Sequence, residues 1–414
     1  MKNFSISPSL INTQAHEICE TLNLAGYQAY LVGGCVRDLL LGTQPKDWDI
    51  CTDASPEKVM QIFTKTIPTG LQHGTVTVVL GEGVENHFEV TTFRVEGKYT
   101  DGRRPEEVIF VANVEQDLAR RDLTINAIAY NSISNQIIDP FSGFDDLNNK
   151  IIRAVGNPKA RFQEDGLRIM RAARFAARFK YNIEDETFKG MKNSLETLKK
   201  VSNERIKDEL CKTLMTENPS YGISLLKGCG ALEIACPFLC SAVLYFKFVS
   251  KLDKCHGDLE TRLALMYGNC KSKLVVNELI GLKISNKEIK RVSFLLDLLD
   301  KYLILESNAS SLAYKSFMAV IKNQSPDPWT YTLEQFIHLT EAMKLPFNVL
   351  LNKYSELIIL SRKEMVINGD DLLAAGIPPG PRIKNALDAC YLQIMISPEN
   401  NTKEYLLKFI TTLI

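Results

Sequence analysis

Residues 31–53 read LVGGCVRDLLLGTQPKDWDICTD, and this stretch decides how the N-terminal part of the chain folds. An apolar strand pattern ends in Gly33 and Gly34, and a short helix pattern follows directly. The alternation of Asp47 and Asp49 around a tryptophan predicts a strand that carries both carboxylates on one face, about 6 to 7 Å apart along the backbone. The stretch therefore predicts a turn beside an oxygen-rich cradle for a hard divalent cation.

Length and composition limit the number of domains and the class of protein. A chain of 414 residues is too long for one ordinary core, which predicts two to four domains. Its hydrophobic share of 45% is enough to form their cores. Lys plus Arg and Asp plus Glu number 49 each, so any nucleic-acid contact must come from local patches and not from net charge.

We find no signal-peptide pattern and no apolar run of the roughly 18 residues that span a bilayer, so we expect a cytoplasmic protein without membrane contact. The ten scattered cysteines are expected to be reduced core residues.

Strand and helix patterns alternate over the first 150 residues, whereas the remainder is helical from about residue 160. The fold class is therefore α+β, with a mixed α/β head of at least four strands before a helical region. The expected elements of the head are a helix at 11–25, a strand at 26–34, a helix at 36–42, a strand at 48–52, a helix at 56–63, strands at 73–83 and 85–95, a polar loop at 95–107, and a strand pair at 108–111 and 136–138 with a helix at 124–130 between them.

The glycine turn and the two carboxylates fit phosphoryl or nucleotidyl transfer. Backbone N–H groups of the turn and of the following helix can hold phosphates, while metal ions bridge the phosphates to the acids. Arg37 adds a charged donor, and Glu89, on the strand face opposite Phe88, offers a third carboxylate. The alternatives are an ordinary strand-to-helix connection, a solvated strand end and a partly exposed strand glutamate.

A second group of charged residues lies on the helix pattern after residue 160. Arginines recur at 168, 171, 174 and 178, which places them on one stripe. Such a stripe is usually solvated. Here it begins with Asp165 and Arg168, which could accept from and donate to the Watson–Crick edge of a nucleobase.

These motifs carry a resemblance to a known family. GGCVRDLLLG with DWDI, RRDLTINAIAY, DPFSGFDDL, EDGLRIMRAARFAARF and NERIKDEL follow, in order and spacing, the pattern of class II tRNA nucleotidyltransferases, which are the CCA-adding enzymes and their bacterial poly(A) polymerase relatives. The resemblance covers residues 25–215. The sequence departs from the pattern at Leu123, where the family usually has Phe, and at Gly166, where Pro is frequent.

The resemblance implies an architecture and a set of site residues. It implies a polymerase-β-like nucleotidyltransferase head at 1–150, a base-recognising helical neck at 151–215, a helical body at 216–345 and a helical, tRNA-binding tail at 346–414. It implies that Asp47, Asp49 and Glu89 are catalytic and ligate Mg²⁺. The implied nucleotide-binding residues are Gly33, Gly34, Arg37, Arg121, Asp122, Asn126, Asp165, Arg168, Arg171 and Arg174. Supporting roles are implied for Glu164, Glu204 and Arg205.

The implied activity is template-independent addition of the 3′-terminal CCA to tRNA from CTP and ATP, with release of pyrophosphate and a two-metal mechanism. The implied partners are tRNA and the two nucleotides, and no protein partner is evident. Three alternatives stay open at this point: a partial enzyme that adds only CC or only A, a poly(A) polymerase, and a catalytically silent RNA-binding protein. The intact acids argue against the silent protein.

Overall fold

The chain forms two compact units, Met1–Pro237 and Phe238–Ile414. The computed structural model describes residues 6–83, 86–96, 108–241, 248–268, 270–306 and 310–412. The loop expected at 95–107 therefore lies outside the described residues, apart from its first two positions. In the described ranges, no helix has both the length and the apolar composition that crossing a bilayer requires. The predicted four-part division is finer than the two units and stays a prediction, and residues 216–237, which it gives to the body, belong to the first unit.

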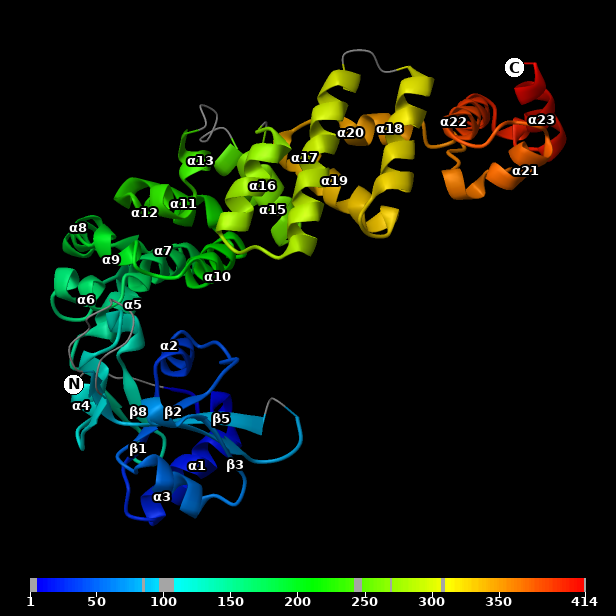
Figure 1. Cartoon of the computed structure of the whole chain (residues 1–414). Coiled ribbons are helices and arrows are strands. Elements are labelled where there is room, and N and C mark those ends of the chain that lie inside the picture. The colour runs from blue at the N-terminus through cyan, green and yellow to red at the C-terminus, as the bar shows by residue number, and fades with distance from the viewer. Residues whose placement is uncertain are drawn as a thin grey trace. The chain divides into compact units, whose positions relative to one another are not determined.

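A mixed seven-stranded sheet forms the head of the first unit (Figure 1). β2 and β5 run parallel, and the other neighbouring strands run antiparallel. The mixed head predicted from the sequence is thus confirmed. In spatial order the strands are β3 (Thr66–Gly70), β4 (Thr75–Val79), β5 (His87–Thr92), β2 (Asp49–Thr52), β1 (Ala29–Val32), β8 (Ala129–Asn131) and β9 (Gln136–Ile138).

The register between β2 and β5 places two acids side by side. Asp49 is paired with Glu89, and Ile50 with Val90. Ile50 and Val90 are buried, so the adjacent Asp49 and Glu89 point to the other face of the sheet. Phe88 is also buried, which confirms the prediction that Glu89 lies on the face opposite it.

Capping groups in the sequence explain where the first helices begin. α1 (Thr13–Leu24) starts after Asn12, whose side chain accepts from the Ala15 N–H at 2.9 Å. α3 (Pro56–Ile62) starts with proline in its first turn, after Ser55 as the cap. α2 (Gly34–Leu40) follows Gly33, whose φ of +79° belongs to the region that favours glycine. The three predicted helices are confirmed, with small shifts at their ends.

Two expectations for the rest of the head are wrong. The predicted helix at 124–130 is a single 3-10 turn, Thr124–Asn126, followed by β8, because Ala129 and Tyr130 complete the sheet beside β1. This tertiary pairing outweighs the local helix pattern. The strands at 108–111 and 136–138 do not pair with each other: β7 (Val108–Phe110) pairs with β6 (Arg94–Glu96), and β9 pairs with β8. β3 was not predicted.

Helices follow the sheet, as predicted. In the first unit α7 (Leu167–Phe179) packs against α10 and α11, and its alanines at 172, 173 and 176 are fully buried, which allows close approach. Beside these helices, β10 (Ile151–Ile152) and β11 (Asn182–Ile183) form a short parallel pair. The remaining helices of this unit are α4 (Val114–Ala119), α5 (Gly143–Asn148), α6 (Pro158–Glu164), α8 (Asp185–Asn193), α9 (Leu195–Leu198), α10 (Asn203–Leu214), α11 (Pro219–Cys229) and α12 (Ala231–Ala235).

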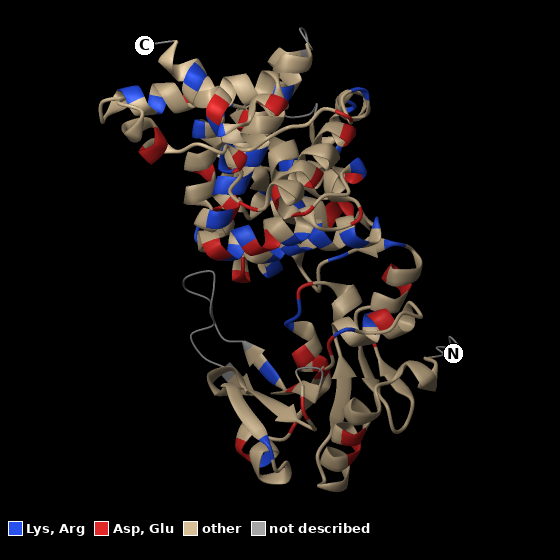
Figure 2. Ribbon diagram, turned by 90° about the vertical axis from the view of Figure 1, so that its right-hand side faces the viewer, with Lys and Arg blue, Asp and Glu red and all other residues tan. Residues whose placement is uncertain are grey.

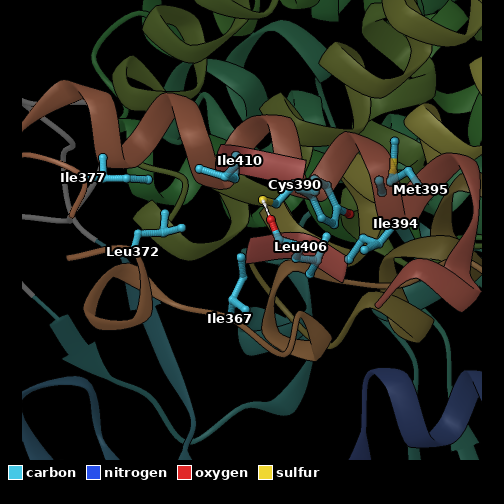
Figure 3. Packing of buried hydrophobic residues seen from close by; sticks show 10 residues of the cluster. Ile367, Leu372, Ile377, Cys390, Ile394, Met395, Leu406 and Ile410 are labelled. Atoms are coloured by element: carbon cyan, nitrogen blue, oxygen red, sulfur yellow. Dashed lines mark hydrogen bonds between the residues drawn. The ribbon is translucent and has the colours of Figure 1, made fainter. Parts of the chain in front are cut away.

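The second unit is helical throughout its described residues. A hydrophobic cluster near its C-terminus joins α21 (Gly369–Ala374), α22 (Pro381–Ile396) and α23 (Lys403–Thr411), and Figure 3 shows its labelled side chains turned toward one another. Lys, Arg, Asp and Glu are interspersed along the helices (Figure 2), which agrees with the equal charge totals. The helices are α13 (Pro237–Ser241) at the unit boundary, α15 (Leu259–Tyr267), α16 (Ser272–Gly281), α17 (Asn286–Glu306), α18 (Ser311–Gln324), α19 (Trp329–Met343), α20 (Phe347–Lys353), α21 (Gly369–Ala374), α22 (Pro381–Ile396) and α23 (Lys403–Thr411).

The cysteines contribute to both cores. All ten have free thiols, and seven of them are buried, in agreement with the prediction of reduced core residues. Burial raises the pKa of the Cys35 thiol, which lies behind the glycine turn, to about 12. A thiol with such a high pKa stays protonated and unreactive at neutral pH.

Candidate active site

Three predicted acids line one open cavity on the sheet. Asp47, Asp49 and Glu89 share a cavity of about 600 Å³ with Lys46, Trp48, Thr77 and His87. Asp49 begins β2, whereas Asp47 lies just before the strand. Asp47 and Glu89 are exposed and Asp49 is half-buried. The structure thus brings together the three acids that the sequence grouped, and their catalytic role stays a prediction.

The electrostatics of Asp49 suit a cation. Burial raises the pKa of Asp49, the guanidinium of Arg121 opposes that rise, and the carboxylates of Glu89 and Asp47 add to it. Among the described residues, no three His, Cys, Asp or Glu side chains converge closely enough to form a complete metal site. The donors present are nevertheless hard oxygens, and a cation that also binds phosphate and water needs only two or three of them. The acids thus fit a divalent cation shared with a phosphorylated ligand.

Gly33 brings the turn next to the acids. A Cβ atom built on Gly33 would lie 2.8 Å from Nη1 of Arg121 and 3.7 Å from Oδ2 of Asp49. Arg121 is itself oriented by Asp117, a fully buried carboxylate of α4 that accepts from Arg121 at 3.4 Å and from Arg120 at 2.8 Å. The buried Nε of Arg121 has no hydrogen-bond partner in the described structure. A guanidinium with spare donors therefore faces the turn and the acids.

A chain of hydrogen bonds joins the head to α7. Nη1 of Arg37 donates to Asn126 at 2.6 Å, Asn126 donates to Asp122 at 3.3 Å, and Nε of Arg171 donates to Asp122 at 2.7 Å. Burial would raise the pKa of Asp122, but Arg171, together with Arg168 and Asn126, outweighs burial and holds this pKa well below its ordinary range. Arg37 also donates to Asp38, so its guanidinium lies between two acceptors of the head. Four residues that the resemblance connects with the nucleotide thus form one network.

The structure does not pair Asp165 with Arg168. Asp165 accepts from Nη2 of Arg205 at 2.7 Å, whereas Arg168 donates to Glu164 and, at 3.0 Å, to the carbonyl oxygen of Arg120. Both side chains sit at the N-terminal end of α7, and Arg168 is buried. Arg205 therefore braces Asp165, and Glu164 braces Arg168. Glu204, the other supporting residue expected, is exposed at the start of α10.

Sequence reasoning missed two supporting acids, Asp117 and Glu209. Nε of Arg174 donates to Oε2 of Glu209 at 2.6 Å, and Glu209 is buried. Glu209 lies on α10, thirty-five positions from its partner, so no local pattern could reveal this pair. Asp117 sits three and four residues before Arg120 and Arg121, which is a helical spacing that could have suggested it.

The sheet, the acids on it and the arginine-bearing helix beside it define a nucleotidyltransferase of the polymerase type. Family models agree along the chain: the poly(A) polymerase head domain matches residues 29–153, the RNA and SrmB-binding site of polymerase A matches residues 180–243, and tRNA nucleotidyltransferase domain 2 matches residues 261–410. The chain is 38% identical over 407 residues to the CCA-adding enzyme of Ligilactobacillus salivarius (strain UCC118), an alignment that covers 95% of each protein. This chain belongs to the family of CCA-adding enzymes.

Solved structures agree with this assignment. The Bacillus stearothermophilus CCA-adding enzyme, solved in complex with CTP, is 31% identical and matches with a TM-score of 0.76 over 97% of this chain and 98% of its own. The Thermotoga maritima CCA-adding enzyme, solved with a tRNA, is 20% identical with a TM-score of 0.70 over 100% of this chain and 99% of its own, and supports the fold alone. Enzymes of this family generally use divalent metals.

Proposed function

We propose that this protein adds the 3′-terminal C, C and A to tRNA, using CTP and ATP and no nucleic-acid template. The observation that carries this proposal is the register of β2 and β5, which sets Asp49 beside Glu89 in the cavity that Asp47 also lines. In the same unit, α7 carries the arginine stripe, and the candidate base-reading residues Asp165 and Arg168 lie at its N-terminal end. The residues to which we assign transfer and those to which we assign base reading therefore belong to one unit, which supports the proposal.

In the proposed reaction, the 3′-hydroxyl of the RNA loses its proton to solvent, and its oxygen attacks the α-phosphorus of the nucleotide. The new O–P bond forms as the bond between the α-phosphorus and the bridging oxygen breaks, and pyrophosphate leaves with that electron pair. Gly33 and Gly34 present backbone N–H groups to the triphosphate, and Arg37, Arg121 and Arg174 neutralise its charge. Asp122 and Asn126 hold Arg171 and Arg37 in place. Positioning and electrostatics supply most of the acceleration.

We propose Mg²⁺ as the cation held by Asp47, Asp49 and Glu89. When bound, such a cation lowers the pKa of the attacking hydroxyl and neutralises the departing phosphates. The three acids contribute oxygen ligands, and their mutual repulsion favours a cation between them.

Base selection is assigned to Asp165 and Arg168. A carboxylate accepts from the exocyclic amino group that cytosine and adenine share, and a guanidinium donates to ring nitrogen or carbonyl. Arg205 and Glu164 fix these side chains at the start of α7, which is the kind of support that makes base reading selective.

Full CCA addition is favoured over the alternatives. The relatives that align over nearly the whole chain are CCA-adding enzymes, which argues against a partial enzyme, a poly(A) polymerase and a silent RNA-binding protein. tRNA, CTP and ATP are the proposed partners, and the cytoplasm is the proposed compartment because tRNA maturation needs access to both nucleotides.

The decisive experiment supplies a tRNA that lacks its 3′ end, together with Mg²⁺ and all four nucleoside triphosphates. We expect the product to carry C, C and A in that order and to stop there, as read by sequencing of the product 3′ ends. A product that stops after CC, or one that carries a long run of A, would contradict the proposal and identify the alternative that holds.

A further inference from the structure

Two phenylalanines of α7 form a platform within the arginine stripe. The rings of Phe175 and Phe179 are stacked, with centroids 6.2 Å apart and planes at 5°. Phe175 is buried and Phe179 half-buried. The guanidinium carbon of Arg37, which belongs to α2, lies 5.3 Å from the centroid of Phe175 and 5.0 Å from that of Phe179. A cation from the helix after the glycine turn thus rests on two rings from the base-reading helix.

Further arginines gather on the same rings. Arg174 lies 4.3 Å from the Phe175 centroid, Arg171 lies 5.6 Å from it, and Arg178 lies 4.9 Å from the Phe179 centroid. With Arg37 this makes four guanidinium groups, whose ion-pair partners in the described structure are the three carboxylates of Asp38, Asp122 and Glu209. The set retains a positive charge, and close approach of like charges costs energy unless another attraction offsets it.

The donors of Arg37 show why rings are suitable partners. Of its five N–H groups, three have acceptors among the described residues, two of them on Asp38 and one on Asn126. A ring face attracts a guanidinium through its quadrupole and uses no N–H group. The platform can therefore hold Arg37 while two donors stay available for an anion.

We propose that Phe175 and Phe179 are positioning residues that hold Arg37 against the triphosphate of the incoming nucleotide. This inference rests on the proposed function, in which Arg37 contacts that triphosphate. CTP and ATP carry the same triphosphate, so loss of the platform should weaken the binding of both nucleotides equally. Base choice, which is assigned to Asp165 and Arg168, stays unchanged.

The test weakens the ring quadrupole without changing ring shape. Phe179 of the full-length protein is replaced by mono-, di- and trifluorophenylalanine, and the Kd values for CTP, ATP and tRNA are measured by calorimetry. We expect the Kd for both nucleotides to rise stepwise, to about fivefold with three fluorines. The Kd for tRNA should stay constant, and the melting temperature should fall by no more than a few degrees, because the same attraction also offsets repulsion among the guanidinium groups of the fold. As a further check, Phe179→Leu should raise both nucleotide KM values more than Phe179→Trp does, because tryptophan keeps a ring face.

The matched control is the same fluorinated series at Phe188 of α8. The ring of Phe188 carries Lys192 at 4.9 Å, so it is also a cation–π partner, but of a cation outside the nucleotide site. Fluorination there should leave both nucleotide Kd values unchanged. Equal Kd values across the Phe179 series would overturn the inference, since the ring would then be only a spacer. Failure of the proposed function would look different: the unmodified protein would not extend tRNA.

Discussion

Asp49 is the residue at which burial and like charge act together. It is half-buried, it pairs in register with Glu89, and its pKa is raised by burial and by the neighbouring acids. A carboxylate in this position is costly for folding, which supports the proposal that it binds a cation.

The first prediction concerns Asp49→Ala. We expect nucleotidyl transfer to fall by about a thousandfold or more, because a lost metal ligand removes several kcal/mol of transition-state stabilisation. Affinity for tRNA should stay near that of the wild type. Single-turnover transfer of labelled CTP and filter binding of tRNA measure the two quantities. Asp53→Ala, just beyond the other end of β2, is the control and should keep transfer. Near-normal transfer by Asp49→Ala would refute the metal assignment.

The second prediction concerns the pH dependence of stability. The folded-state pKa of Asp122 lies below its unfolded value of about 3.9, so the stabilisation is fully present above that value and is lost as pH falls toward the folded pKa. Asp122→Asn should lower the melting temperature at pH 7 by roughly 5 to 10 °C, and this difference should shrink between pH 4 and pH 2.

Calorimetry from pH 7 down to pH 2 would follow this difference. Glu115→Gln, which changes an exposed carboxylate of α4, should leave the melting temperature unaltered throughout. A difference for Asp122→Asn that stayed constant below pH 4 would show that the ion pair with Arg171 is not its source.

Single residues differed in how far the sequence could place them. Asp47, Asp49 and Glu89 were identified together because strand alternation fixes the face on which each lies. Their neighbours Asp117 and Glu209 were not, since ion pairs between distant elements depend on tertiary packing that no local pattern encodes. Gly166 is another position whose tertiary surroundings no local sequence pattern could reveal. By the family pattern it is only a departure from a frequent proline, yet a Cβ atom there would lie 2.4 Å from the backbone nitrogen of Leu198.

At the scale of elements, α7 connects the proposed roles. Asp165 lies just before the helix, and Arg168 is in its first turn. The middle of the helix contacts Asp122 and Glu209 through Arg171 and Arg174, and its packing face is lined with alanines. Helical periodicity sufficed to predict this element. It failed at residues 124–130, where Ala129 and Tyr130 of β8 pair with β1 and this pairing outweighs a weak helical preference.

The third prediction concerns the turn between β1 and α2. Gly33→Ala adds a Cβ atom 2.8 Å from Nη1 of Arg121 and strains a positive φ. We expect the KM for CTP and for ATP to rise about tenfold as Arg121 is displaced, with the fold retained. Steady-state kinetics measure this effect. Gly42→Ala is the control, since Gly42 has a φ of +70° and a Cβ atom added there would meet no atom within 4 Å, so it introduces strain without a clash. Equal effects of both variants would assign the loss to strain alone.

At the scale of the whole molecule, the two units have separate cores. The cluster in the second unit includes Leu372, Cys390, Ile394 and Leu406, all fully buried. Sequence periodicity predicted the helices of this unit but not the boundary at residues 237 and 238, because a boundary depends on which helices share a core and not on the pattern within each helix.

The fourth prediction tests whether these cores are independent. Leu372→Ala should destabilise the second unit by about 2 to 5 kcal/mol, because it leaves a cavity in the cluster. Hydrogen exchange should accelerate in α21, α22 and α23, and stay unchanged in the sheet of the first unit. Leu373→Ala removes a side chain that is 44% exposed and should alter neither region. Faster exchange in the sheet after Leu372→Ala would show that the units unfold together.

The parallel register of β2 and β5 also makes it difficult for a misfolded head to keep its activity, because the same register sets both the acid pair and the apolar packing of the sheet. Side chains alternate along a strand, so a slip of one residue would turn Glu89 toward the buried side and bring Phe88 or Val90 beside Asp49. Such a molecule would lose its acid pair and its apolar packing at once. Errors in folding the head should therefore yield protein that is both unstable and inert, and tRNA would be left unfinished and not extended with the wrong bases.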